Sequence, residues 1–173
     1  MRIHLEHSTA LVVDIQERLF PHIHENVRLA ERCAMLIQGL RILDVPIIVT
    51  QQYTKGLGPT IAPIADALDD FDPYEKMSFS CCGNPDVEAM LLSRHGHQVI
   101  IMGIETHVCV LQTVIDIQVQ GRTAIVVEDC VSSRSENDKR IALDRMRSLG
   151  AIITTAESLL FELMVSSDHD SFK

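Results

Sequence analysis

Missing from this sequence are the features that mark membrane proteins and nucleic-acid-binding proteins. No apolar run reaches the roughly 20 residues that a membrane-spanning helix needs. The 15 lysine and arginine residues form no dense cluster, and the net charge is -9, so the chain lacks the basic surface that binds a phosphate backbone. We therefore expect neither a membrane nor a nucleic acid among its partners.

Motifs for cofactors and for serine nucleophiles are also missing. The 5 cysteines include no C-x-x-C pair, which argues against a zinc site or a thioredoxin-like motif. There is no Walker-A pattern and no G-x-S-x-G elbow. Gly56 and Gly58 resemble part of a dinucleotide-binding loop, but Pro59 follows them and position 61 is not a glycine. We expect no bound cofactor.

Two pairs of histidines are the remaining candidates for a metal site. His22 with His24, and His95 with His97, have an i, i+2 spacing that could reach one ion from a loop. Neither pair has a cysteine or carboxylate spaced to complete a ligand set. We interpret both pairs as surface histidines and expect no metal.

The composition indicates one globular domain over residues 1–173. A chain of this length, with 46% hydrophobic and 23% charged residues, can bury about 70% of its unfolded surface without staples. Residues 1–7 show neither the apolar stretch nor the cleavage site of a signal peptide. We expect a cytoplasmic protein whose cysteines are free thiols, because reducing compartments disfavour disulfides.

Apolar runs alternate with amphipathic stretches along the chain, which is typical of an α/β fold. The expected strands are residues 9–14, 45–50, a short strand within 71–79, 97–102, 123–127 and 151–154. The expected helices are 25–43, 60–68, 84–93, 106–120, 136–149 and 157–165, with a loop at 51–59 and a frayed polar tail at 166–173. This order predicts a parallel sheet with helices on both faces, in which ligands bind beyond the carboxyl ends of the strands.

The stretch after the fourth expected strand has the pattern of a nucleophile. Gly103 ends an apolar run and predicts a tight turn. Thr106 is a good helix N-cap, and apolar residues from Val108 onwards follow the spacing of a helix face. Cys109 would lie in the first helical turn, where free N–H groups and the helix dipole favour a thiolate.

Asp14, Lys76 and Cys109 each fall at the end of a different expected strand, so a parallel sheet brings them to the same edge. Asp14 is suited to take the thiol proton and return it to a leaving amine. Lys76 would lower the thiol pKa by its charge and keep Asp14 oriented. The backbone N–H groups of Glu105 and Cys109 are placed to form an oxyanion hole.

Each of these residues also has an ordinary structural explanation. A cysteine such as Cys109 is a common core residue, an aspartate after a strand often belongs to a turn, and a lysine is usually a solvated charge. Phe20, Tyr53 and Phe79 lie near the expected strand ends and could wall a substrate pocket, but core packing explains them equally well. The functional interpretation therefore depends on the joint placement.

Three separated motifs resemble the isochorismatase-like cysteine hydrolases, in that family's order and over most of the chain. They are residues 11–16 (LVVDIQ), 75–79 (EKMSF) and 103–110 (GIETHVCV). Residues 52–58 (QYTKGLG) and 131–134 (VSSR) resemble the subgroup called isochorismatase domain-containing proteins. The resemblance implies a three-layer α/β/α fold with a six-stranded, mostly parallel sheet. It also implies an Asp-Lys-Cys triad, which falls on the same three residues as above.

The resemblance has further implications for the turn before the cysteine. It implies a cis peptide bond between Ile104 and Glu105, which turns the Glu105 N–H towards the proposed oxyanion hole. Thr106 and His107 are expected to contact the substrate. Family nicotinamidases carry an aspartate and two histidines for a metal after the second strand, where residues 51–54 here are QQYT. True isochorismatases lack the cysteine, so neither nicotinamide nor isochorismate is favoured as the substrate.

A homodimer or larger homo-oligomer is expected for two reasons. Such assemblies are usual in the family that the chain resembles. In addition, the helix after the cysteine is apolar on more than one face, because Val110, Ile117 and Val119 lie outside the stripe that faces the sheet. Packing against the sheet alone would leave these residues uncovered, which indicates a subunit contact.

Two hypotheses of different classes follow from these observations. The first is a metal-independent cysteine hydrolase that acts on a small amide-like or related acyl substrate through a thioester at Cys109. The second is a non-catalytic, thiol-sensing oligomer that keeps the fold and uses Cys109, or the adjacent Cys81 and Cys82, for oxidation. A third possibility, a nucleotide-binding module, has no phosphate loop to support it.

Overall fold

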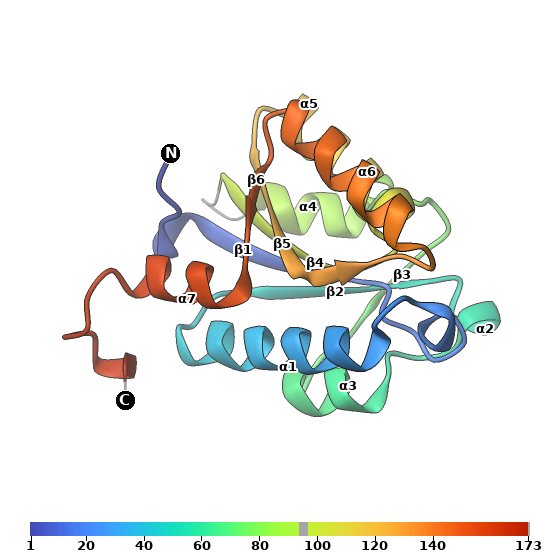
Figure 1. Ribbon diagram of the computed structural model, residues 1–173, viewed down its shortest axis with the longest axis horizontal. Helices are drawn as coiled ribbons and strands as arrows, with labels where there is room; N and C mark the ends of the chain where they lie inside the picture. Colours follow the sequence, from blue (N-terminus) through green and yellow to red (C-terminus); the bar gives the residue numbers. More distant parts are fainter. Residues whose placement is uncertain (94–96, 173) are drawn as a thin grey trace.

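Six parallel strands form the central sheet of the protein (Figure 1), seen in a computed structural model that describes residues 1–93 and 97–172. The strand order is β3-β2-β1-β4-β5-β6, and every neighbouring pair is parallel. The strands are β1 (Ser8–Val13), β2 (Ile47–Gln52), β3 (Tyr74–Lys76), β4 (Gln98–Ile104), β5 (Thr123–Ser132) and β6 (Ile152–Thr154). The predicted six-stranded α/β fold is confirmed.

Helices cover both faces of this sheet, which makes the three layers that the sequence predicts (Figure 1). One face carries α1, α3 and α7, and the other carries α4, α5 and α6. The helices are α1 (Asn26–Ile42), α2 (Thr54–Leu57), α3 (Ala62–Leu68), α4 (Pro85–Ser93), α5 (Leu111–Val119), α6 (Glu136–Ser148) and α7 (Ala156–Met164).

Alternate residues of the strands fill two separate hydrophobic cores. In β1, Ala10 and Val12 face the core beneath α1, while Leu11 and Val13 face the core beneath α5. Successive side chains of a strand point to opposite faces, so a strand covered on both sides must be apolar at every position. This requirement explains the continuous apolar runs of the sequence.

The chain changes direction across the sheet beside β1. From β1 it builds outward to β2 and β3, and then crosses back so that β4 pairs with the other edge of β1. The gap beyond the carboxyl ends of β1 and β4 is therefore a topological switch point, where open α/β sheets bind ligands. Asp14 directly follows β1 at this point.

Several predicted boundaries were wrong. β5 continues past residue 127 to Ser132, because β4 offers it a second paired stretch at Gly103 and Ile104. Between Ile101 and Gly103 β4 has one residue, whereas the matching part of β5 has four, residues 127–130. The expected loop at 51–59 contains the end of β2 and the short helix α2. The expected frayed tail contains a short 3-10 helix at Asp170–Phe172.

Helix α5 buries more of its surface within a single chain than the sequence led us to expect. Val110 and Ile117, which were interpreted as candidates for a subunit contact, are fully buried in the monomer. Val119 is 81% exposed and is the one of the three that remains accessible. The packing of α5 thus gives little support to an oligomer, since the neighbouring helices and the sheet already cover it.

Gly103 allows β4 to approach β1 closely just before the switch point. Its φ is +125°, and a Cβ atom built on it would lie 2.1 Å from the Val13 carbonyl oxygen and 2.7 Å from the Val13 nitrogen. Both contacts involve backbone atoms, which cannot turn away as a side chain can. A glycine is therefore required by space as well as by conformation.

Replacing Gly103 by alanine is expected to lower the free energy of unfolding by about 3 kcal/mol or more, from backbone strain and the clash with Val13 together. The matched control is Gly121→Ala, where φ is +74° and, beyond the adjoining residues, no atom of residues 1–93 and 97–172 lies within 4 Å of the added atom. That variant should lose only about 1–2 kcal/mol. Urea unfolding of both variants measures the difference, and equal losses would contradict this account of the β1–β4 contact.

Candidate functional site

Asp14, Lys76 and Cys109 lie together beyond the carboxyl ends of the strands. Lys76 is the last residue of β3, and its Nζ atom reaches past β2 to lie 2.6 Å from Asp14 Oδ2. Thr50 Oγ1 donates to the other carboxylate oxygen at 2.8 Å. The three residues are nearly closed to solvent, with exposed fractions of 1%, 2% and 7% for Asp14, Lys76 and Cys109.

The ammonium group of Lys76 is surrounded by oxygen acceptors. Besides Asp14, it donates to Gln52 Oε1 at 2.7 Å, to the Phe79 carbonyl at 3.0 Å and to the Ser78 carbonyl at 3.2 Å. Burial by itself lowers the pKa of Lys76, but the negative charge of Asp14, with further contributions from nearby thiols, outweighs it. The pKa therefore lies above its ordinary value, and the lysine keeps its charge.

Two glutamines complete this environment, and sequence reasoning missed both of them. Gln16 is fully buried and donates to the carbonyls of Gln52 and Gly58, at 3.1 Å and 2.7 Å. Its Oε1 accepts from the Gln52 N–H at 2.7 Å. The sequence did contain an indication for Gln52. Thr50 and Gln52 are two residues apart on one strand, so their side chains lie on the same face of the sheet, the face that meets Asp14 and Lys76.

The surroundings of Cys109 act on its pKa in the opposite direction to the one expected. Burial and the Asp14 carboxylate raise the pKa of the Cys109 thiol to about 12, and the charge of Lys76 lowers it only in part. The local helix also differs from the prediction. Thr106–Val110 is a π-helical turn, and α5 begins only at Leu111, so the sulfur is not at the start of an α-helix.

The turn before Cys109 is held by the Glu105 carbonyl, which accepts from the N–H groups of Val108 at 3.1 Å and Val110 at 3.2 Å. Thr106 does not cap the helix with its side chain as predicted. Its hydroxyl is buried and has no hydrogen-bond partner among the described residues. The peptide bond between Ile104 and Glu105 is cis, which confirms that prediction.

The side chains of this turn are tied to the end of β5. Glu105 Oε1 lies 2.9 Å from Arg134 Nε and also accepts from the Arg134 N–H at 3.2 Å. His107 Nδ1 lies 2.9 Å from Ser133 Oγ. His107 was expected to contact the substrate, and the structure gives the side chains of both Glu105 and His107 fixed partners within the protein.

The three aromatic residues proposed to wall a pocket separate into two groups. Tyr53 and Phe79 are exposed beside Lys76, since the Tyr53 N–H donates to the Lys76 carbonyl and Lys76 donates to the Phe79 carbonyl. Met77, which directly follows Lys76 in the sequence, is exposed as well. Phe20 is partly buried and packs against the core beneath α1, as the core-packing explanation predicts.

Cys81 lies near the same group of residues, and sequence reasoning did not place it there. Its Sγ atom is 3.6 Å from Thr50 Oγ1, and its N–H donates to Thr113 Oγ1, which in turn donates to the Cys109 carbonyl at 2.7 Å. Burial and the charge of Asp14 raise the pKa of Cys81 to about 12. The pKa of Cys82 is raised to about 11, mainly by burial. All 5 cysteines are free and buried.

The described residues form no group of three histidine, cysteine, aspartate or glutamate side chains that could hold a metal ion. His22 is exposed and His24 half-buried, and His97 is exposed, whereas His95 lies outside the described residues. Across residues 1–93 and 97–172, no helix is both long enough and apolar enough to span a membrane.

A separate hollow of about 280 Å³ lies between α1, the end of β5 and α6. Its charged residues have ion-pair partners within the hollow or beside it. Lys139 lies 2.8 Å from Glu128 and Arg28 lies 3.7 Å from Glu25, while Arg140 pairs with Asp144 outside it. Asp14, Lys76 and Cys109 do not line this hollow. Because its charges are already compensated, we consider the buried group around Asp14 the better candidate for chemistry.

The raised pKa of Cys109 predicts an unusual pH dependence for its alkylation by iodoacetamide. The rate should climb about tenfold per pH unit without levelling near pH 9, because the reactive thiolate forms only near pH 12. Asp14→Asn removes a charge that raises this pKa, so the variant should be alkylated faster at pH 8. Mass spectrometry of the labelled peptide gives both rates. A plateau near pH 9, or slower labelling of Asp14→Asn, would contradict this assignment.

Comparison with known proteins places the chain in a family. Residues 8–158 match the family model described as the isochorismatase domain. Isochorismatase domain-containing protein 2 of Danio rerio is 35% identical over 172 residues, covering 99% of this chain and 86% of the relative. A solved structure of MAR1 ribonuclease from Caenorhabditis elegans is 40% identical, with a TM-score of 0.94, covering 99% of this chain and 88% of the other.

A more distant structure shares the same fold. The Escherichia coli YcaC protein, described as an octameric hydrolase of unknown specificity, has a TM-score of 0.93 at 23% identity, covering 98% of this chain and 85% of its own. The family model and the relatives agree with each other on the family, and the solved structures share the fold. The chain therefore belongs to the isochorismatase family, within the subgroup of isochorismatase domain-containing proteins.

Proposed function

We propose that the protein is a metal-independent cysteine hydrolase that cleaves a small amide or related acyl substrate. The observation that carries this proposal is the buried Asp14–Lys76 ion pair beside the Cys109 thiol. A charged pair is costly to bury, and here it lies next to a potential nucleophile at the switch point of the sheet. Membership of a hydrolase family supports the same class of reaction.

In the first half of the reaction, Cys109 Sγ attacks the acyl carbon while its proton passes to the Asp14 carboxylate. Proton transfer must accompany attack, because the thiol pKa of about 12 leaves almost no free thiolate at neutral pH. The N–H groups of Glu105 and Cys109 bind the oxyanion of the tetrahedral intermediate. Asp14 then protonates the leaving amine, which departs as the carbon–nitrogen bond breaks and a thioester remains.

In the second half, Asp14 removes a proton from water, and the resulting hydroxide attacks the thioester carbonyl. The carbon–sulfur bond breaks, the acid product leaves, and Asp14 returns the proton to the sulfur. Lys76 stays protonated throughout, since its raised pKa keeps the charge that orients Asp14. The net change is addition of one water across the acyl bond.

RNA hydrolysis is a second candidate, because the similar Caenorhabditis elegans structure is described as a ribonuclease. An RNA backbone is held mainly by lysine and arginine side chains, whereas this chain has a net charge of -9. We therefore favour acyl transfer and include RNA among the substrates to be tested.

Thiol sensing, the alternative of another class, is supported by the nearness of Cys81 to the Cys109 turn. Reaction with peroxide requires a thiolate and access to solvent. Cys81 and Cys82 are buried, and their pKa values are raised to about 12 and about 11. These properties disfavour oxidation of the vicinal pair.

Cys109→Ala is expected to reduce turnover on a panel of small amides and activated esters by about 10³-fold or more, because the variant lacks the sulfur that forms the proposed thioester. The matched control is Cys82→Ala, a cysteine of similar burial on the same side of the sheet, which should retain wild-type turnover. Equal activity of Cys109→Ala and the wild type would contradict the mechanism. Cleavage of RNA alone, with no acyl substrate turned over, would favour the ribonuclease candidate.

We expect a homo-oligomer in solution, as in the octameric Escherichia coli relative. Tyr53, Met77 and Phe79 form an exposed apolar group beside the site, and such groups often lie in subunit contacts. Light scattering at micromolar concentration should give at least twice the chain mass of 19.3 kDa. A monomeric mass would refute the assembly without affecting the proposed chemistry.

A further inference from the structure

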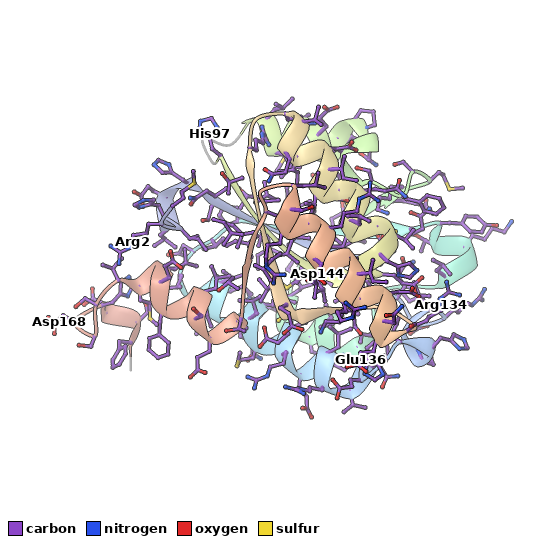
Figure 2. All side chains as sticks on the ribbon, turned by 45° about the horizontal axis from the view of Figure 1, so that its top comes forward. Arg2, His97, Arg134, Glu136, Asp144 and Asp168 are labelled. Carbon is purple, nitrogen blue, oxygen red and sulfur yellow. The ribbon has the colours of Figure 1, made fainter. Side chains whose placement is uncertain are left out.

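An ion pair joins the turn before Cys109 to the segment that follows β5. The Glu105 side chain is 9% exposed, and a single carboxylate oxygen accepts from both the backbone N–H and the Nε atom of Arg134. Arg134 lies two residues beyond Ser132, at the carboxyl end of the sheet, whereas His97 and Arg2 lie at the opposite end (Figure 2). Two donors on one oxygen fix the position of the carboxylate.

Residues 132–134, which include Arg134, are also held by hydrogen bonds to His24. The Ser133 carbonyl accepts from the His24 N–H at 2.9 Å, and Ser132 Oγ donates to the His24 carbonyl at 2.8 Å. Ser133 Oγ also contacts His107, which belongs to the same turn as Glu105. The end of β5 is thus a fixed support, and two side chains of the turn bind to it.

We infer that the Glu105–Arg134 ion pair positions the Glu105 N–H for the oxyanion, which makes Arg134 a positioning residue for acyl transfer. The inference rests on the proposed function, in which that N–H is one of two oxyanion donors. The charged carboxylate of Glu105 is largely buried and depends on a cationic partner. Without Arg134 it would turn towards water and move the backbone of its own residue.

If Arg134 positions the Glu105 N–H, its loss should slow the acylation of Cys109 and leave the alkylation of Cys109 unchanged. An oxyanion exists only when the sulfur attacks a carbonyl, so a displaced donor slows acylation. Alkylation by iodoacetamide displaces iodide at a saturated carbon and develops no oxyanion. Both reactions use the same sulfur, but only acylation places a negative charge on the substrate oxygen. A loss of acylation with alkylation unchanged therefore points to the groups that act in acyl transfer, the oxyanion donors among them.

The test compares acylation of Cys109 by p-nitrophenyl acetate with its alkylation by iodoacetamide. Acylation is followed by p-nitrophenolate release and by the gain of one acetyl group in the intact mass. The variants are Arg134→Met, Glu105→Gln and the double variant. The matched control is Arg140→Met, since the Arg140 side chain is 65% exposed and that of Arg134 is 62%, and both pair with a carboxylate.

Arg134→Met should acylate about tenfold more slowly, because small misplacements of catalytic groups cost large factors in rate. Its alkylation rate should stay within about twofold of the wild type, and Arg140→Met should match the wild type in both reactions. The double variant should be no slower than the slower single variant, as expected for two residues that act as one unit.

Two results would overturn the inference while leaving the proposed function intact. Equal acylation of the wild type and Arg134→Met would show that the ion pair does not position the donor. A parallel loss of acylation and alkylation would assign Arg134 a purely structural role. Failure of wild-type Cys109 to accept the acetyl group at all would overturn the proposed function itself, and the inference with it.

Discussion

The buried ion pair between Lys76 and Asp14, whose charged atoms lie 2.6 Å apart, determines which polar groups must surround it. Removing each charge from water costs several kcal/mol, and their mutual attraction compensates only if the remaining hydrogen-bonding positions are also filled. Thr50 donates to the other carboxylate oxygen here, and Gln52 and two backbone carbonyls accept from the ammonium group. Buried Gln16 in turn holds Gln52 in place. Much of the polar interior at this end of the sheet thus exists to support one ion pair.

The sheet determines where that pair can form. β1 lies between β2 and β4, so its carboxyl end is the one point that side chains from both halves of the sheet can reach. Lys76 comes from the edge strand β3 and the Cys109 turn from β4, while Gly103 lets β4 pass close to Val13 immediately before Asp14. The parallel arrangement orients all these strand ends in the same direction. The meeting of these side chains therefore follows from topology as much as from residue type.

The sequence was sufficient for the strands, because burial on both faces leaves continuous apolar runs. It was also sufficient for the location of Asp14 and Cys109 at the carboxyl end of the sheet, because each directly follows such a run or its turn. Lys76 had a weak local signal and became a candidate only through joint placement and resemblance. The π-helical turn, the length of β5 and the raised pKa of Cys109 could not be predicted. They depend on burial, on a partner strand distant in sequence, and on the charge of Asp14, none of which a local pattern records.

The four-residue segment of β5 that faces a single residue of β4 separates two tasks of the sheet. Pairing up to Val126 builds the core, and pairing from Val131 onwards carries Ser133 and Arg134 to the turn before Cys109. A change of length within residues 127–130 would move the second part and leave the first in register. Val127 and Cys130 of this segment are fully buried in the core beneath α1, and Val127 also pairs with Thr154 of β6. In this fold, any remodelling of the site wall at this segment would therefore also repack the core of the sheet.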